Sequence, residues 1–198
     1  MKLFANAKFL LAAHDGRQLP ADDGAEIAFA GRSNAGKSSA LNALTNRNAL
    51  ARTSRTPGRT QQLVVFDLDN ERRLVDLPGY GFAKAPKDLR QHWQNVIERY
   101  LRERRSLRAL VLIMDIRHPL KPVDQQLLGF CAEIGLPCLV LLTKADKLSR
   151  NQAQAALAKT RRDIASAGWQ ADLQLFSATK KTGVEEARQA VAELLGAA

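Results

Sequence analysis

Eight consecutive residues near the N-terminus have the types and spacing that bind a phosphate chain. They fit the pattern G-x-x-x-x-G-K-S and run Gly31-Arg32-Ser33-Asn34-Ala35-Gly36-Lys37-Ser38. The glycines let the backbone bend so that successive N–H groups face an anion, and a helix beginning at Lys37 adds the positive end of its dipole. Lys37 can reach the β- and γ-phosphates, and the Ser38 hydroxyl can ligate Mg²⁺. We call this segment the P-loop, and it predicts a nucleotide site.

A second motif, Asp76-Leu77-Pro78-Gly79, fits D-x-x-G and follows an apolar stretch. Alone, this pattern is an ordinary turn. Its place after a predicted strand and its distance from the P-loop favour a role at the phosphates. Asp76 would then hold Mg²⁺ through a water molecule, and the Gly79 N–H would contact the γ-phosphate.

A third motif, Thr143-Lys144-Ala145-Asp146, resembles the guanine-reading pattern N-K-x-D with Thr in place of Asn. The Asp146 carboxylate can accept two hydrogen bonds from guanine, from N1–H and from the N2 amino group. Adenine lacks this donor pair, so the acid would discriminate between the two bases. The Lys144 stem would lie over the base, and the loop at 176–179 would offer backbone contacts to guanine O6.

A long polar segment, 46–62, separates the first predicted helix from the next strand and is rich in Arg and Thr. A mobile loop here is what a switch that responds to the γ-phosphate requires. One threonine should ligate Mg²⁺ when GTP is bound. Thr56 and Thr60 both qualify on chemistry, and either could instead be a simple turn hydroxyl.

Alternating strands and helices must position these motifs. Short apolar runs predict strands at 26–30, 61–67, 72–76, 110–114, 136–142 and 173–176, the second and third of them flanking a hairpin turn. Apolar residues at helical spacing predict helices at 37–45, from 89 onward, and at 123–134, 151–167 and 183–195. This order predicts an α/β fold with a mostly parallel sheet and helices on both faces, whose ligands bind beyond the carboxyl ends of the strands.

Composition narrows the classes of partner. The chain has 198 residues, 45% of them hydrophobic, which excludes a wholly disordered chain and suits one domain. Lys and Arg number 30 against 20 acidic residues, a net charge of +10 that favours polyanions such as RNA.

Cys131 and Cys138 lack a metal-binding spacing and are expected to be packed thiols. No run of 18 apolar residues predicts a membrane span. Residues 1–13 are expected to form an edge strand or a first turn rather than a signal peptide.

Together these motifs closely resemble those of the EngB family of bacterial GTPases, in the Era/EngA-like branch of the P-loop GTPases. Besides the P-loop, the matching segments are 57–61 (PGRTQ), 76–83 (DLPGYGFA), 115–118 (DIRH) and 143–147 (TKADK). The resemblance extends from Gln18 to the final helix. It implies a Ras-like fold with a six-stranded sheet and one antiparallel strand. It also implies a single GTPase domain over 1–198, with 1–24 as an N-terminal extension.

The resemblance further implies a GTP-hydrolysing switch in assembly of the large ribosomal subunit, tied to cell division and septation. It favours Thr60 over Thr56 as the second Mg²⁺ ligand. We expect a cytoplasmic monomer that binds GTP and GDP, the large subunit or its rRNA, and no membrane. Mg²⁺ would be held by Ser38, Thr60 and, through water, Asp76, and catalysis would involve Lys37, Thr60 and Gly79. The residues expected to contact GTP are Gly31, Arg32, Ser33, Asn34, Ala35, Gly36, Lys37, Ser38, Gly58, Arg59, Thr60, Gln61, Gln62, Asp76, Leu77, Pro78, Gly79, Thr143, Lys144, Ala145, Asp146, Phe176, Ser177 and Ala178.

Three features leave alternatives open. Tyr80 stands where Ras-like proteins place the glutamine that orients water, which predicts slow unassisted hydrolysis, on the order of 10⁻⁴–10⁻² s⁻¹. The alternative is a nucleotide-dependent module that binds RNA or a division protein with negligible turnover. Asn34 could help hold a K⁺ ion, as in related GTPases, or simply form a turn. Arginines of the 46–62 segment and of 99–108 could grip RNA, or the latter could be a solvated helix end.

Overall fold

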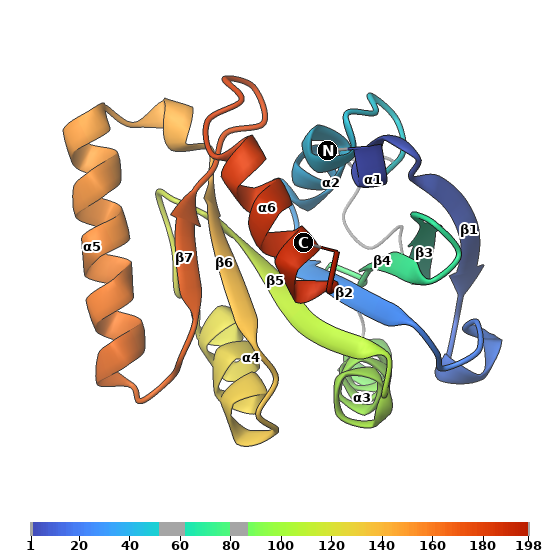
Figure 1. Ribbon diagram of the computed structural model, residues 1–198. Coiled ribbons are helices and arrows are strands. Elements are labelled where there is room, and N and C mark those ends of the chain that lie inside the picture. Colours follow the sequence, from blue (N-terminus) through green and yellow to red (C-terminus); the bar gives the residue numbers. More distant parts are fainter. Residues whose placement is uncertain (1, 52–61, 80–86, 198) are drawn as a thin grey trace.

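The computed structural model describes residues 2–51, 62–79 and 87–197, with side chains from 94 onward in the last range. Figure 1 shows a central sheet between two groups of helices. The elements are α1 (Lys2–Ala5), β1 (Lys8–Ala13), η1 (Gly16–Gln18), β2 (Ala25–Gly31), α2 (Lys37–Thr45), β3 (Leu63–Asp67), β4 (Arg72–Asp76), α3 (Lys87–Glu103), β5 (Leu107–Asp115), α4 (Pro122–Glu133), β6 (Cys138–Thr143), η2 (Ala145–Lys147), α5 (Arg150–Ser166), β7 (Asp172–Leu175) and α6 (Val184–Leu194).

The sheet has the order β1-β3-β4-β2-β5-β6-β7. Strand β3 runs antiparallel to both of its neighbours, β1 and β4, and the remaining pairs are parallel. This confirms the expected mostly parallel α/β sheet with one antiparallel strand. The parallel strands β2, β4, β5, β6 and β7 therefore end at one edge, which is where the motif-bearing loops emerge.

The described part of the sheet has seven strands, one more than the six expected. The additional strand is β1, which pairs with β3 at the edge of the sheet. Its side chains are mostly exposed, with Phe9 59% and Leu10 41% accessible. Because β1 has so little buried surface, its sequence lacks the alternation of apolar and polar residues that marks a half-buried strand. The sequence was therefore equally compatible with an edge strand and with a turn.

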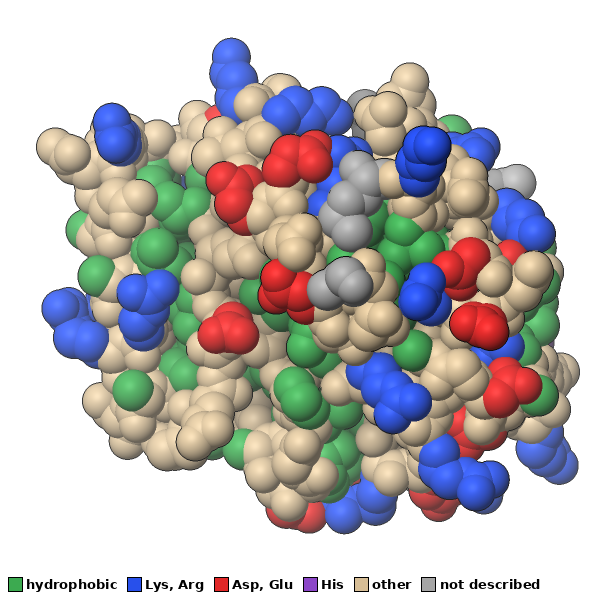
Figure 2. Space-filling model, viewed as in Figure 1, with side chains coloured by type: hydrophobic (Ala, Val, Ile, Leu, Met, Phe, Trp, Pro, Cys, Tyr) green, Lys and Arg blue, Asp and Glu red, His purple; other side chains and the backbone are tan. Residues whose placement is uncertain are grey.

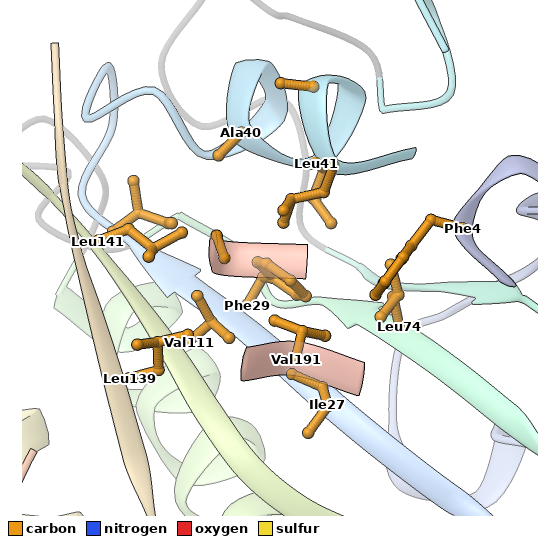
Figure 3. Close-up of a cluster of buried hydrophobic side chains, with 14 of the residues drawn as sticks. Phe4, Ile27, Phe29, Ala40, Leu41, Leu74, Val111, Leu139, Leu141 and Val191 are labelled. Atoms are coloured by element: carbon orange, nitrogen blue, oxygen red, sulfur yellow. The ribbon is translucent and has the colours of Figure 1, made fainter. Parts of the chain in front are cut away.

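One face of the sheet is covered by α1, α2 and α6. Figure 3 shows Phe29 of β2 between Leu41 of α2 and Val191 of α6, with Phe4 of α1 at the side of the cluster. These side chains are at most 1% exposed. Burial of an aromatic or aliphatic side chain contributes about 1.5–3 kcal/mol, so this cluster fixes α2 and the loop that precedes it against β2.

The other face packs against α3, α4 and α5. Tyr100 and Leu101 of α3 are buried there with Leu128 of α4 and Ile164 of α5. Because both faces are covered, the middle stretches of the central strands β2, β5 and β6 are apolar rather than alternating, and polar residues stand only near the strand ends. Tyr100 is a core residue as expected, and Trp169 packs partly buried against the same cluster.

Cys131 and Cys138 are buried free thiols, as predicted. A hydrogen bond with Cys138, together with burial, raises the pKa of Cys131 well above its usual value. Cys131 is therefore not an activated nucleophile. Within the described ranges, no helix combines the length and apolar character needed to cross a bilayer.

Candidate functional site

The predicted motifs meet at the carboxyl edge of the sheet. The P-loop follows β2, Asp76 ends β4, Thr143 ends β6, and Ser177 lies just after β7. Strand β2 pairs with β4 on one side and β5 on the other, so the phosphate motifs are neighbours in space. Segments far apart in the sequence therefore surround one end of α2.

Glycines at both ends of the P-loop are required by space and conformation. A Cβ on Gly31 would lie 2.9 Å from the Ile113 carbonyl oxygen, so β2 can approach β5 only without a side chain there. Gly36 has φ of 100°, a left-handed conformation that glycine adopts without strain, and α2 begins at the next residue. Asn34 also has a positive φ, 64°, which fits a turn-forming asparagine.

The guanine motif supports the P-loop directly. The Thr143 hydroxyl lies within hydrogen-bond distance of the Ala35 and Met114 carbonyl oxygens, and with one proton it can donate to only one of them at a time. The Lys144 Nζ donates to the Asn34 carbonyl oxygen at 2.7 Å. Threonine in place of the usual asparagine therefore still ties this motif to the P-loop.

Lys37 and Asp76 form an ion pair in which both side chains are largely buried. Burial raises the pKa of Asp76, and the neighbouring Lys37 opposes that shift. The Ser38 hydroxyl stands one residue into α2. Hydroxyl and carboxylate oxygens suit Mg²⁺, which usually takes one or two protein ligands beside phosphate oxygens and water. The described residues contain no group of three or more acidic, His or Cys side chains that could hold a metal.

Asp146 is held by the loop after β7. The buried Ser177 hydroxyl donates to Asp146 Oδ1 at 2.6 Å, and its oxygen accepts the Lys180 N–H at 3.1 Å. The Ser177 hydrogen bond lowers the pKa of Asp146, which keeps the carboxylate ionised and acceptor-only at neutral pH. Only backbone contacts were predicted for Ser177, so its orienting hydroxyl is an additional role.

Asp115 was matched in sequence only as part of a motif, and the structure places it beside Lys144. Its carboxylate accepts from the Arg117 guanidinium at 2.6 and 2.9 Å and lies 3.0 Å from Lys144 Nζ. Burial alone would raise its pKa, but the Arg117 and Lys144 hydrogen bonds hold the pKa of Asp115 well below its usual value. The Asp115–Lys144 ion pair sets the position of the Lys144 stem, over which the base is expected to lie.

The remaining predicted residues fall into two groups. Leu77 and Pro78 are buried, Gly79 is half-buried, and Gln62 contacts His14 at 2.8 Å through their side-chain nitrogens. The contact set also includes Phe176, which is buried and whose carbonyl accepts the Ala145 N–H at 3.1 Å. Residues Thr56, Gly58, Arg59, Thr60, Gln61 and Tyr80 lie outside the described residues.

Arginines at the end of α3 are paired with acids. Arg99 bonds Glu103 at 2.8 Å, Arg102 bonds Glu133 at 2.9 Å, and Arg104 bonds the buried Glu26. On the face in Figure 2, cationic side chains are scattered over the surface and interleaved with acidic ones rather than gathered in one patch. Arg99 and Arg102 therefore match a solvated helix end, whereas Arg104 is a buried structural charge.

Comparison with known proteins agrees with this geometry. Residues 26–144 match the family model described as a 50S ribosome-binding GTPase. A curated protein of Stenotrophomonas maltophilia (strain K279a), "Probable GTP-binding protein EngB", is 58% identical over 195 residues, covering 98% of both chains. The chain belongs to the EngB family. It is therefore a member of a family of GTP-binding GTPases, as the sequence motifs predicted.

Further relatives extend the EngB match. A protein of the same name from Xanthomonas euvesicatoria pv. vesicatoria is also 58% identical, over 98% of this chain and 94% of its own length. A crystal structure of a probable GTP-binding protein engB superposes with a TM-score of 0.70 at 22% identity, covering 87% of this chain and 99% of that one. Era in complex with MgGDPNP and a 16S ribosomal RNA fragment gives 0.65 at 20% identity, covering 87% and 57%. At these identities the structural likenesses establish the fold alone.

Proposed function

We propose that this EngB-family protein binds GTP at the carboxyl edge of its sheet and uses hydrolysis to switch its contact with the large ribosomal subunit. The observation that carries the nucleotide site is the convergence of the P-loop, Asp76 and the Asp146–Ser177 pair around the start of α2. The proposal treats 1–198 as one GTPase domain, with 1–24 as an extension packed on it.

Each part of the site has a chemical task in this proposal. Backbone N–H groups of 31–38 and the Lys37 ammonium bind the β- and γ-phosphates, while Asp146 reads guanine N1–H and N2. Mg²⁺, when bound, supplies positive charge to the phosphate oxygens, and Ser38, Thr60 and Asp76 (through water) are the residues that would hold it. Residues 58–62 and 77–79 complete the phosphate side, and 143–146 with 176–178 complete the base side.

Hydrolysis is proposed to proceed by in-line attack of water on the γ-phosphate. Among the described residues around the P-loop, the acidic side chains are already committed: Asp76 to Lys37, Asp115 to Arg117, and Asp146 to Ser177. Positioning and charge neutralisation by Lys37, Thr60 and the Gly79 N–H would therefore dominate over general-base catalysis. Without a stimulating partner, slow turnover is expected. A K⁺ ion near Asn34 remains a proposed activator, tested by comparing hydrolysis in K⁺ and Na⁺ buffers.

The proposed ribosomal role is supported by the family match and by the net positive charge of the chain. The family model carries the description of a 50S ribosome-binding GTPase, and the net charge of +10 suits an RNA-rich partner. We place the RNA contact at the arginines of 47–59 rather than at the end of α3, because the latter are paired with acids. A cytoplasmic monomer with a link to cell division and septation completes the proposal.

Co-sedimentation tests this role. The full-length protein is incubated with purified large ribosomal subunits at fixed salt, with a non-hydrolysable GTP analogue or with GDP, and the pelleted protein is quantified. Selective pelleting with the analogue is expected, and Lys37→Ala should abolish that selectivity. Equal pelleting in both states, or none, would contradict the proposed switch.

A binding module with negligible turnover is the second candidate, and Tyr80 at the position after D-x-x-G is the feature that favours it. Phosphate release measured with and without large subunits separates the two. Stimulation by subunits supports the GTPase switch, whereas tight state-independent binding without phosphate release supports the module.

A further inference from the structure

The side chain of Arg32, the second residue of the P-loop, extends toward α4. Its Nε donates to Asp124 Oδ2 at 3.2 Å, and its Nη2 donates to the His118 carbonyl oxygen at 2.9 Å. The Arg32 side chain is 24% exposed, and that of Asp124 is completely buried. Charge-assisted hydrogen bonds to a desolvated carboxylate are stronger than surface ion pairs, so this contact is a firm anchor.

Asp124 serves the helix as well as the P-loop. The same carboxylate oxygen that meets Arg32 accepts the Lys121 N–H at 3.0 Å, which caps the first turn of α4. A buried carboxylate in the first turn also suits the positive end of the helix dipole. The Arg32 guanidinium is thereby joined to a rigid element on the far side of β5 rather than to a loose loop.

The two halves of the P-loop then have separate supports. Asn34 and Ala35 are held through their carbonyl oxygens by Lys144 and Thr143. Arg32 is held through its side chain by α4 and by the loop that follows β5. That loop is itself fixed at Asp115, which contacts Lys144. Both supports therefore converge on the end of β5.

We propose that Arg32 is a positioning residue for nucleotide binding. By holding the first half of the P-loop against Asp124 and His118, the Arg32 guanidinium presets the backbone N–H groups of the loop for the phosphates, without itself touching the phosphates. Preorganisation of this kind lowers the cost of ordering the loop when ligand binds. The inference rests on the proposed nucleotide site and is independent of any ribosomal role.

A double-mutant cycle tests the proposal with the full-length protein. The dissociation constant and dissociation rate of a fluorescent GDP are measured for Arg32→Gln, Asp124→Asn and the double variant. Asp124→Asn removes the negative charge that strengthens the contact with Arg32, while its amide keeps an acceptor oxygen for the helix cap. Thermal unfolding is followed in parallel. Each single variant should weaken GDP binding on the order of 10-fold, through faster dissociation. The double variant should be no more than about twofold weaker than the weaker single.

Three further measurements separate positioning from other roles. Arg32→Lys keeps a positive charge for Asp124 but loses the hydrogen bond to the His118 carbonyl oxygen, so it should restore GDP binding partly. The same variant replaces Arg32→Gln in the cycle if Arg32→Gln does not fold. At saturating GTP the kcat of Arg32→Gln should stay within about twofold of wild type while KM rises, because Arg32 touches no reacting atom. The matched control is the exposed pair Arg17–Asp15, at 3.0 Å, where Arg17→Gln and Asp15→Asn should leave binding unchanged.

Distinct results would overturn the inference. Wild-type affinity in Arg32→Gln would show that the anchor is dispensable. Additive losses in the cycle, or a loss of kcat at saturation, would show that Arg32 contacts the nucleotide itself. Lys37→Ala serves as the reference: if that variant bound GDP like wild type, the nucleotide site itself would be misplaced.

Discussion

The two ends of β2 both carry charged groups, but they use them in opposite ways. At its carboxyl end, Lys144 and Thr143 hold the P-loop through its carbonyl oxygens, and the Arg32 side chain joins it to α4. At its amino end, the fully buried Glu26 accepts from Tyr100 at 3.0 Å and from Arg104 at 2.6 and 3.1 Å. Arg73 completes this amino-end cluster, at 3.4 Å from Glu26.

The comparison shows which charges serve structure and which serve a ligand. The hydrogen bonds of Glu26 join β2 to β4 and to the end of α3. Burial and the Glu26 charge raise the pKa of Tyr100 well above its usual value, so its hydroxyl remains a donor. At the carboxyl end the side chains instead orient backbone and one carboxylate. Mutations at the two ends should therefore affect different observables.

The largest effect is expected for Asp146→Asn at the ligand end. The asparagine amide has one acceptor oxygen and one donor NH₂ group. Its NH₂ would therefore face a donor of guanine, either N1–H or the N2 amino group, and that hydrogen bond would be lost. Rejection of a base that lacks its hydrogen-bond partner reaches about 10⁴-fold, so GTP binding should fall by at least about 100-fold. Xanthine, which has an oxygen in place of the N2 amino group, should bind better than guanine. Competition between GTP and XTP measures this, and an unchanged preference for GTP would contradict the role of Asp146.

At the opposite end, Glu26→Ala should affect stability rather than ligand binding. Removing one partner of a buried ionic cluster leaves Arg73 and Arg104 buried beside each other and typically costs about 3–5 kcal/mol. Urea unfolding should report this loss, while GDP affinity at low temperature stays near wild type. The exposed Glu103, which pairs with Arg99 at 2.8 Å, offers a control whose alanine variant should change stability by less than about 1 kcal/mol.

These two ends also differ in how far the sequence predicted them. The proposed phosphate and guanine sites consist of residues adjacent in the chain, such as 31–38 and 143–146, so each motif is visible as a linear pattern. The Glu26 cluster draws on positions 47 to 78 residues apart, and nothing in the local sequence pairs them. Glu26 itself lies in a run predicted as a buried strand, where an acidic residue has no local explanation.

The same reasoning explains the other differences. The strand β1 was ambiguous because an exposed edge strand needs no apolar alternation. The functions of Ser177 and Arg32 depend on side-chain direction, which the P-loop and guanine patterns do not specify. Helix α2 was predicted with its observed bounds, Lys37–Thr45, because Gly36 and the buried face of the helix both mark it locally.

A smaller effect on stability is expected for Asp22→Asn near the amino end. Burial alone would raise the pKa of Asp22, but hydrogen bonds from the Ser106 and Arg105 N–H groups lower it from 3.8 to about 2. A carboxylate whose pKa is lower in the folded than in the unfolded protein stabilises the fold at pH values above its unfolded-state pKa. This stabilisation is lost as the pH falls through the folded-state pKa. Asp22 should therefore contribute up to about 2 kcal/mol at neutral pH, lost between about pH 4 and pH 2.

Thermal unfolding across this pH range checks the expectation. The difference in Tm between wild type and Asp22→Asn should be largest near pH 6 and shrink toward zero near pH 2. A difference that is constant with pH would assign the effect to lost packing rather than to the ionised carboxylate.

The smallest effect, and the sharpest comparison with Asp22, concerns Ser177→Ala at the ligand end. Both carboxylates have a lowered pKa, but Asp22 is held by backbone N–H groups for the fold, and Asp146 is held by the Ser177 hydroxyl for the base. Losing one hydrogen bond to a charged group should weaken GDP binding by on the order of 10-fold. It should also raise the pKa of Asp146, so that binding begins to fail at a higher pH on acidification than in wild type. Ser177→Thr keeps the hydroxyl and should restore both the GDP affinity and the pKa of Asp146. In Ser177→Ala, the free energy of unfolding should change by less than the free energy of GDP binding does. If Ser177→Ala instead lowered stability and binding equally, the hydroxyl would belong with the structural charges of the amino end rather than with the ligand site.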